Sequence, residues 1–505
     1  MLTRLVIACG VLVSVHAPLV AGPLLVHETM ALPQTPAYWT PLANSIRASA
    51  DAQHVLYTLL NRGQVAVAFD GVQGTPYSQV VGPQISPDSN RYAYLARRDN
   101  LWWLVVDQTA SLGFPPQGGP IFSPDSSRVA YWARYGNPTA VFLVVDGHQD
   151  PPFDRVISDS LQFSPDSSRV AYVVQHDRLS AVVENGKKGV GFDQVIGQLV
   201  FSPDSARLAY VAVRGRQQQV VVNGLVGRRY QEIGGVPVFS ADSSHLAYWA
   251  KRSDNRWVVV LDGKERTGYE ADAYQGLVFS PDASRLAGFV RRGSDWFLVI
   301  NGQSGSAYQK VRPDGLVFSP DSKHVAYMVQ QGIKWRVVKN GWEHPAYDRL
   351  MDGSMRFSHD SSRLAYVGFR QGQWRLAVDG YEQRGFDQIL PDSLRFGDGR
   401  SKLAYVATNG SKHHVVIEGH PQHACDEATM PVWAPGASHL AWLAKRGNQW
   451  RVVVDGVEDD HPFEHLVPGA NLVFGSPTHI RLLTMDRSGS KLNCGRLEVK
   501  IRPRG

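Results

Sequence analysis

The sequence predicts an all-β fold, a β-propeller of twelve four-stranded blades, because one phrase returns along the chain at nearly constant intervals. F-S-P-D-S-S-R-V-A-Y occupies residues 122–131 and again 163–172, and close copies begin at Phe201, Phe239, Phe318 and Phe357. Successive copies are 37 to 41 residues apart once the weaker ones are included. A fixed period of this size indicates one supersecondary unit copied many times. The weaker copies begin at Ala48, Ile85, Phe279, Phe396, Trp433 and Phe474.

We expect each repeat to form four short antiparallel strands. In the repeat around Phe318, the polar run Pro320–Ser322 predicts a turn, because short polar side chains can bond the backbone there. The dipeptide Asn340–Gly341 predicts a hairpin, since both positions tolerate positive φ, and equivalents recur in most repeats. The strands expected from this pattern are residues 316–318, 324–329, 335–339 and 347–350.

The third strand of each repeat is almost continuously apolar, as in Val258–Val260. Burial on both faces is typical of sheets that pack on other sheets. Four-stranded sheets that repeat radially form a propeller. We expect the aromatic residues that open the repeated phrase to be buried, and the tryptophans that recur at the start of the third strand to pack between blades. These residues are Phe201, Phe239, Phe318 and Phe357, and Trp257, Trp296, Trp335, Trp374 and Trp450.

The phrase F-S-P-D-S-x-R-x-A-Y resembles the WD40-like repeat of TolB-type propellers, which also occurs in the propeller of prolyl-oligopeptidase relatives. The resemblance extends over nearly the whole chain after its first segment, and it implies a propeller fold. The chain differs from TolB because it lacks room for a separate N-terminal α/β domain and has roughly twice the number of blades. One propeller fold serves many functions, so the resemblance carries no function over to this chain.

The two ends of the chain are expected to complete one blade together. Aligning Ala48 with Phe357 places Tyr38 on Tyr347, so residues 38–42 are expected to be a fourth strand that lacks the three before it. The last repeat has three strands and no fourth. Pairing of residues 38–42 with residues 497–501 would close the ring and remove an exposed sheet edge. Even spacing without linkers favours a single ring of twelve blades, and two tandem six-bladed propellers are the alternative.

Residues 1–21 are expected to be an export signal, because Arg4 precedes an apolar run at residues 5–15. A lipoprotein box around Cys9 fits less well, since too little chain precedes it. Residues 22–37 are expected to be a linker and residues 38–505 the propeller. No later run approaches the roughly 18 apolar residues of a membrane-spanning helix. The expected location is the periplasm or the outside of the cell.

The sequence predicts no catalytic site, no metal site and no cofactor. The aspartate of the repeated phrase occurs in nine repeats, which suits a turn-forming role better than that of a general base. Residues of metal-ligating types gather at 420–427 and 459–465, but their spacing matches no strong metal motif. No nucleophile elbow or phosphate-binding loop occurs. Cys425 and Cys494 belong to repeats ten and twelve and are expected to be separate thiols.

Basic residues are expected to gather on one face of the ring. In a four-stranded meander, the second-to-third hairpins share a face with the connections between blades. The turns of the repeated phrase and the third-to-fourth hairpins share the opposite face, where Glu265, Glu343, Glu382 and Glu458 are expected. The net charge is +6. The basic residues expected on the first face are Arg97, Arg98, Arg134, Arg214, Arg216, Lys251, Arg252, Arg291, Arg292, Arg370, Lys445 and Arg446.

The leading hypothesis from the sequence is a non-enzymatic, exported binding or scaffold protein in the cell envelope. The partner would be a protein, an acidic polysaccharide or a lipid head group, because a positive surface attracts anions. Nucleic acid is not expected outside the cytoplasm, and the sequence says nothing of the oligomeric state. The alternative is a carbohydrate-active enzyme, a lyase or hydrolase with or without metal assistance, with its site at the central channel. Unrepeated His, Glu or Gln side chains gathered at the channel mouth would favour that enzyme.

Overall fold

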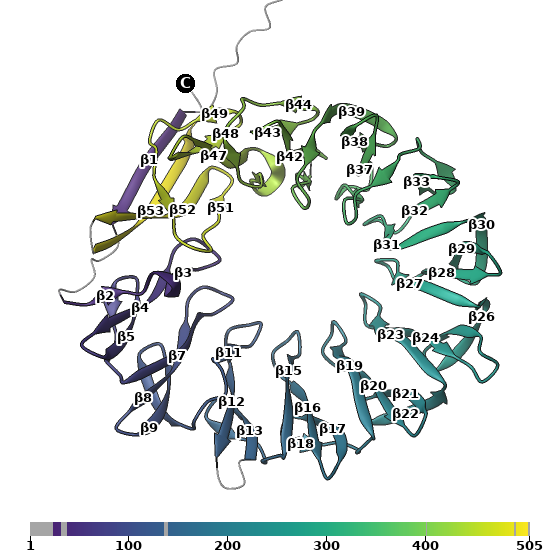
Figure 1. The fold of residues 1–505 in the computed structure, drawn as a ribbon, viewed down its shortest axis with the longest axis horizontal. Coiled ribbons are helices and arrows are strands. Elements are labelled where there is room, and N and C mark those ends of the chain that lie inside the picture. The colour runs from purple at the N-terminus through teal and green to yellow at the C-terminus, as the bar shows by residue number, and fades with distance from the viewer. Residues whose placement is uncertain (1–23, 32–37, 136–139, 400, 489–490, 503–505) are drawn as a thin grey trace, which may run out of the picture.

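The chain forms one closed ring of twelve antiparallel sheets around a central opening (Figure 1). The computed structural model describes residues 24–31, 38–135, 140–399, 401–488 and 491–502. Each sheet is one blade, and its first strand lies innermost in the ring. The predicted fold class and the single ring are therefore confirmed. Among the described residues, no helix is long and apolar enough to cross a membrane.

The first and second strands of blades 1 to 12 form the inner half of each sheet. In five blades the first strand is interrupted and has two pieces. The first strands are β2 (Thr40–Pro41) with β3 (Arg47–Ala48), β7 (Gln79–Ile85), β11 (Ile121–Phe122), β15 (Arg155–Phe163), β19 (Gln194–Phe201), β23 (Glu232–Phe239), β27 (Ala273–Phe279), β31 (Lys310–Phe318), β35 (Arg349–Leu350) with β36 (Arg356–Phe357), β40 (Gln388–Ile389) with β41 (Arg395–Phe396), β45 (Glu427–Ala428) with β46 (Val432–Trp433), and β50 (His465–Leu466) with β51 (Val473–Ser476). The second strands are β4 (Val55–Asn61), β8 (Tyr92–Arg98), β12 (Val129–Tyr135), β16 (Val170–His176), β20 (Leu208–Arg214), β24 (Leu246–Lys251), β28 (Leu286–Arg292), β32 (Val325–Gln331), β37 (Leu364–Arg370), β42 (Leu403–Asn409), β47 (Leu440–Arg446) and β52 (His479–Ser488).

The third and fourth strands form the outer half, and two short 3-10 helices, η1 (Ala43–Ser45) and η2 (Pro435–Ala437), lie in inner loops. The third strands are β5 (Gln64–Phe69), β9 (Leu101–Val106), β13 (Ala140–Val145), β17 (Leu179–Glu184), β21 (Gln217–Val222), β25 (Trp257–Leu261), β29 (Asp295–Ile300), β33 (Lys334–Lys339), β38 (Gln373–Val378), β43 (Lys412–Ile417), β48 (Gln449–Val454) and β53 (Lys491–Arg502). The fourth strands are β6 (Val72–Gln73), β10 (Thr109–Gly113), β14 (His148–Gln149), β18 (Lys187–Lys188), β22 (Leu225–Tyr230), β26 (Lys264–Ala271), β30 (Gln303–Tyr308), β34 (Trp342–Glu343), β39 (Tyr381–Phe386), β44 (His420–Pro421), β49 (Val457–Glu458) and, for blade 12, β1 (Leu24–Ala31).

The hydrophobic core is divided among the interfaces between blades. Each of twelve buried clusters joins residues of two neighbouring blades, so there is one cluster for each interface. The cluster between blades 4 and 5, for example, packs Val173 and Phe192 against Leu208 and Tyr210. The last cluster packs Leu483 of blade 12 against Tyr57 of blade 1. Sheets that are apolar on both faces thus bury both faces, as the continuous apolar strands predict.

The ring is closed by an N-terminal strand, as predicted, but by a different segment from the one expected. All eight residues of β1 pair antiparallel with β53, from Leu24 opposite Arg502 to Ala31 opposite Gly495. Thr40 and Pro41 instead pair with Leu60 and Leu59 of β4, inside blade 1. The prediction for residues 38–42 is wrong because these residues begin the first strand of blade 1. β1 lies within residues 22–37, which were expected to be a linker.

The same error affects the strand expected at residues 347–350. Tyr347 still bridges Trp335 at the outer edge of blade 8, but Arg349 and Leu350 pair with β37 of blade 9. The fourth strand lies earlier, at β34 directly after the Asn340 hairpin. First strands are correspondingly longer than expected, because a bulge lets them continue past an irregular segment, as between Val311 and Leu316.

Seven of the repeated turns link their blade to the next one. In these seven turns the backbone N–H of the aspartate donates a hydrogen bond of 2.9–3.3 Å to a serine hydroxyl in the following blade. Within one turn, Ser164 donates to Asp166 at 2.6 Å, which with further bonds from Ser168 lowers the pKa of Asp166 to about 2. We call this series the serine relay. It passes through Asp51–Ser89, Asp88–Ser126, Asp125–Ser167, Asp166–Ser205, Asp204–Ser243, Asp282–Ser322 and Asp321–Ser361.

The arginine of the repeated phrase adds a second link to the next blade. The Arg207 guanidinium lies over Phe239 of the following blade at 4.8 Å, and that of Arg285 lies over Phe318 at 4.7 Å. The prediction that Phe201, Phe239, Phe318 and Phe357 are buried is wrong, since all four are half-buried. Arg169, Arg207 and Arg285 cover three of these rings, and Lys339 covers that of Phe357 at 5.7 Å. Each phenylalanine ring is therefore covered by a cation that stays in contact with water, and the ring is not fully enclosed in the hydrophobic core.

Removing β1 is expected to destabilise the ring, because β53 would become an unpaired edge. A chain that starts at residue 36 should have a lower melting temperature than one that starts at residue 22 and should aggregate as its concentration rises. The loss should amount to several kcal/mol, since each net hydrogen bond contributes about 0.5–1.5 kcal/mol. Equal melting temperatures for the two chains, measured by differential scanning fluorimetry, would contradict this account of closure.

Each hydrogen bond of the serine relay is expected to contribute measurably to the free energy of unfolding. Ser322→Ala should lower the free energy of unfolding by about 0.5–1.5 kcal/mol, the net value of one hydrogen bond. Ala283→Ser should raise it, because blade 7 carries Ala283 where the relay has serine. Ser244→Ala is the control, since that hydroxyl bonds Asp242 in its own turn. A Ser322→Ala cost no larger than that of Ser244→Ala in denaturant titrations would show that the inter-blade bond adds nothing.

Candidate functional site: the hairpin face

All twelve basic residues predicted from the sequence lie at the C-terminal end of a second strand or in the hairpin that follows it. Every blade is the same antiparallel meander, so these hairpins project from one face of the ring. We call it the hairpin face, and the opposite one, with the turns of the serine relay, the turn face. The hairpin face also holds the blade connections, because Arg214 donates to the Gly191 carbonyl in the connection that enters blade 5, at 2.9 Å.

Several of these cations stack on a tryptophan that faces them across the hairpin. Lys251, Arg291 and Lys445 are the direct cross-strand partners of Trp257, Trp296 and Trp450. Each cation lies 5.5–5.8 Å from the centre of the indole ring. The recurrent tryptophans are buried or half-buried between blades, as predicted. An aromatic ring under a cation restricts its rotamers while leaving the charge at the surface.

The expected separation of charge between the two faces is wrong. Glu382 and Glu458, expected on the turn face, form ion pairs with Arg370 at 3.1 Å and with Arg446, respectively. Glu265 lies 3.7 Å from Arg252, which also pairs with Asp254. The fourth strands are short, so a glutamate near the turn face still reaches an arginine that extends along the blade. These three arginines are therefore largely neutralised within their own blades.

The hairpin face also carries a ring of aspartates that sequence reasoning missed. Asp193, Asp272, Asp387 and Asp426 begin or precede a first strand, and each accepts a hydrogen bond of 2.6–2.8 Å from a glycine N–H in the hairpin of the same blade. The signal is visible in the sequence, since an aromatic residue or Cys425 usually stands directly before this position. These carboxylates hold the hairpins in place and lower the positive charge of the face.

Four of the predicted basic residues, on three consecutive blades, have no carboxylate partner to neutralise their charge. Arg214, Arg216, Lys251 and Arg291 come from blades 5, 6 and 7, and within the described chain none of them lies within 4.0 Å of a carboxylate oxygen. Arg214, Arg216 and Arg291 are exposed, and Lys251 is half-buried against its tryptophan. We call these four residues the basic arc.

The other predicted residues lie outside the basic arc or are engaged elsewhere. Arg292 donates to the carbonyls of Glu270 and Gly268, so it holds the edge of blade 6. Lys445 pairs with Glu427 at 2.7 Å. The remaining residues are Arg97, bonded to Asn100, Arg98, close to Asp99 and over Trp103, and Arg134, which lies against the Gln117 amide.

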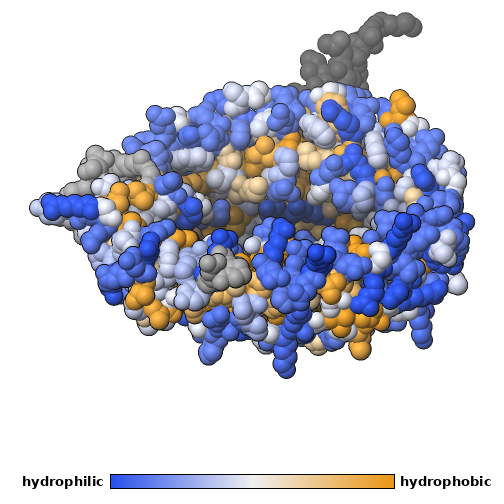
Figure 2. All heavy atoms as spheres, turned by 60° about the horizontal axis from the view of Figure 1, so that its bottom comes forward, coloured by the Kyte–Doolittle hydropathy of each residue, from blue (hydrophilic) through white to orange (hydrophobic). Residues whose placement is uncertain are grey.

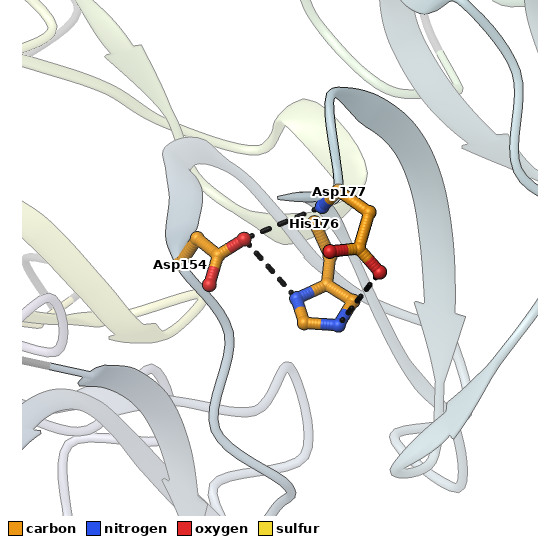
Figure 3. A group of neighbouring side chains, drawn as sticks. All are labelled: Asp154, His176 and Asp177. Carbon is orange, nitrogen blue, oxygen red and sulfur yellow. Dashed lines mark hydrogen bonds and ion pairs between the residues drawn. The ribbon is translucent and has the colours of Figure 1, made fainter.

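One group of metal-ligating side chains comes together on the same face in blade 4 (Figure 3). His176 Nδ1 lies 3.2 Å from Asp154, and its Nε2 lies 3.4 Å from Asp177. Asp154 holds the position of the hairpin aspartates, and it accepts a hydrogen bond from the Asp177 N–H at 3.3 Å. Both carboxylates are mostly exposed. The fold and local ion pairing account for this group, and it shows no enclosed set of ligands.

The residues of metal-ligating types in blades 10 and 11 do not assemble. Cys425 is buried in the interface between blades 10 and 11, and burial raises the pKa of its thiol. Asp426 pairs with Lys412 at 2.6 Å, and Asp459 is buried. Among the described residues, the blade 4 group is the one set of three or more ligands close enough to share an ion. Cys425 and Cys494 are separate buried thiols, as predicted.

The centre of the ring is a hollow whose wall mixes hydrophilic and hydrophobic residues (Figure 2). Among the described residues, the carboxylate and histidine side chains of its innermost strands are Asp159, Glu232, Asp314, Glu427 and His465. They belong to five different blades, namely 4, 6, 8, 11 and 12, and Glu427 is held in its ion pair with Lys445. Glutamines such as Gln84, Gln162 and Gln198 are likewise spread over different blades. The gathering of unrepeated polar groups that would favour a channel enzyme is not seen in the described part of the first strands.

No family model matches the chain, and no curated protein matches it. Similar solved structures include a eukaryotic initiation factor, with 13% identity over 71% of this chain and 91% of that one and a TM-score of 0.34. TolB from Acinetobacter baumannii has 15% identity over 52% of this chain and 80% of its own, with a TM-score of 0.23. The β-propeller domain of Cps50 (Swd1) from Myceliophteria thermophila has 12% identity over 50% and 95%, with a TM-score of 0.23. These likenesses add nothing to the propeller fold that the sheet order already establishes.

Proposed function

We propose that the protein is a non-enzymatic binding or scaffold protein that holds an extended anionic partner on its hairpin face. The observation that carries the proposal is the basic arc, in which cations without carboxylate partners recur on three consecutive blades. Lys251 and Arg291 hold the same strand position in blades 6 and 7, and Arg214 lies one residue later in blade 5. Basic side chains at the same end of successive blades suit a partner with a repeated charge. Weak contacts at each blade then add up through multivalency.

The structure of the arc supports binding at low entropic cost. Lys251 and Arg291 are placed by their cross-strand tryptophans, and Arg214 lies over the Phe192 ring at 5.2 Å. Side chains that are already ordered lose less rotamer freedom when a ligand binds. Of the partners considered, an acidic polysaccharide of the cell envelope fits best, because its carboxylates repeat along the chain. An anionic lipid surface and an acidic protein are the other possible results of the test. Export to the envelope belongs to this proposal, since the expected signal, residues 1–21, lies outside the described residues.

Reversing the charge of the basic arc is expected to abolish most of the binding. Arg216→Glu, Lys251→Glu and Arg291→Glu together should weaken binding to an immobilised polyuronate by at least about tenfold, or about 1.4 kcal/mol. Arg214 and Arg292 are left intact, because both hold backbone carbonyls. Binding of the unaltered protein should fall as salt rises, since the screening length is about 8 Å at physiological ionic strength.

The matched control makes the same change in net charge on the turn face. Lys187→Glu, Lys188→Glu and Lys323→Glu replace exposed lysines there and should leave polyuronate binding nearly unchanged. The same two triple variants are tested against anionic lipid vesicles and against acidic proteins from an envelope extract. If no anionic probe distinguishes the basic-arc variant from the control, or if binding is insensitive to salt, the proposed function is wrong.

A further inference from the structure

The interface between blades 6 and 7 departs from the repeat at several positions at once. On the turn face of the neighbouring interfaces, an arginine covers the phenylalanine of the next blade. Arg169 lies 5.1 Å from the Phe201 ring and donates to the Ser205 carbonyl at 2.6 Å. Blade 6 has His245 at the arginine position, and blade 7 has Ala283 at the serine position. The serine relay therefore has no hydroxyl at this step, and Phe279 lacks the guanidinium that covers Phe201, Phe239 and Phe318.

The shorter histidine does not cover Phe279 in the way that Arg169, Arg207 and Arg285 cover Phe201, Phe239 and Phe318. His245 Nδ1 bonds Asp262 at 2.7 Å, and its ring stacks on Phe279 with the centroids 6.2 Å apart. Beside this pair lies a cleft of about 380 Å³. Cavities of this size lie within the range of small-molecule sites. Its lining residues include His245, Leu261, Arg266, Thr267, Phe279 and Leu286.

A second set of departures from the repeated sequence shapes the outer wall of the cleft. Blade 7 has Gly288 where the repeated phrase has tyrosine, and Tyr269 of β26 is buried and donates to the Leu286 carbonyl at 2.6 Å. The ladder between β25 and β26 shifts register next to Trp257, and Gly268 adopts a φ of +84°. A Cβ on Gly268 would lie 2.1 Å from the Gly302 carbonyl, so only glycine permits this approach of blade 6 to blade 7.

The chemistry of the lining favours an anionic ligand that contains a planar ring. No lining residue carries a carboxylate, whereas Arg266 is exposed and has no ion pair among the described residues. Phe279 and His245 offer an aromatic surface, and Leu261 and Leu286 add apolar contact. Comparable hollows on the turn face, between blades 3 and 4 and between blades 4 and 5, have different linings. One contains Asp146 and Asp150, and the other contains Glu184.

We propose that the cleft between blades 6 and 7 binds a small aromatic carboxylate. Its ring lies against Phe279 and His245, in the place of the missing guanidinium, and its carboxylate accepts charge-assisted hydrogen bonds from Arg266. Thr267, an exposed residue of the same lining, supplies a further hydroxyl donor. This site lies on the turn face, opposite the basic arc, so it is independent of the proposed polyanion binding.

The test uses benzoate as the probe, with the full chain and saturation-transfer NMR titrations up to about 10 mM, since a one-ring ligand is expected near the millimolar range. Benzoate should bind saturably. Arg266→Gln should weaken binding by at least about tenfold. His245→Arg should abolish it, because a guanidinium would cover Phe279 as it covers the equivalent ring in other blades. Lys264→Gln is the matched control: it removes one positive charge from the same strand, outside the lining, and should bind benzoate like the unaltered protein.

Two further probes separate the chemistry of the site from its alternatives. Benzamidine has the same ring with a cationic group, and inorganic phosphate is an anion without a ring. Tighter binding of benzamidine would overturn the proposal, because the cleft would then take a cation in place of the arginine. Equal binding of phosphate and benzoate would also overturn it, as would unchanged benzoate binding by His245→Arg or no saturable benzoate binding at all. Since His245→Arg restores the repeat, it should fold, which its melting temperature checks.

Discussion

The hydrogen bond from a turn aspartate to a serine of the next blade, made in seven of the turns, is the directional contact on which most of the ring depends. A propeller must repeat one interface many times and still bring the last blade to the first. The core clusters supply apolar burial at each interface, but apolar packing is non-directional. The serine relay adds a directional contact at a fixed point near the inner edge, where the blades are closest, and the stacked arginine adds a second one. Where they occur, they set the position of one blade relative to the next, and β1 completes the last sheet.

The sequence was sufficient for the blade number and the strand order, because both follow from a period and from turn chemistry that are local along the chain. It was not sufficient for the boundary between blades. Tyr347 and Arg349 are two residues apart, but Tyr347 pairs with a strand of blade 8 and Arg349 with a strand of blade 9. Nothing in the local sequence pattern marks that change. The error at residues 38–42 has the same cause. The half-burial of Phe239 was missed because it depends on Arg207 of the preceding blade.

The candidate site was predictable only in outline. Topology alone placed the basic residues on one face, and the structure agrees. Which of them keep their charge depends on ion pairs between the second and fourth strands of one blade, such as Arg446 with Glu458 and Arg370 with Glu382. The repeat pattern does not show which glutamate reaches which arginine. The hairpin aspartates were visible as a recurring residue but had no predictable partner. In a repeat protein the departures from the repeat are the informative positions, and His245, Ala283 and Gly288 gather at one interface.

The most direct test of the account is electron microscopy of the purified protein, with class averages viewed down the axis of the ring. The account predicts one annulus of twelve blades around an open centre, with no break between the blade that contains β1 and its neighbours. Two smaller rings of six blades, or an annulus open at the blade formed by both chain ends, would contradict it.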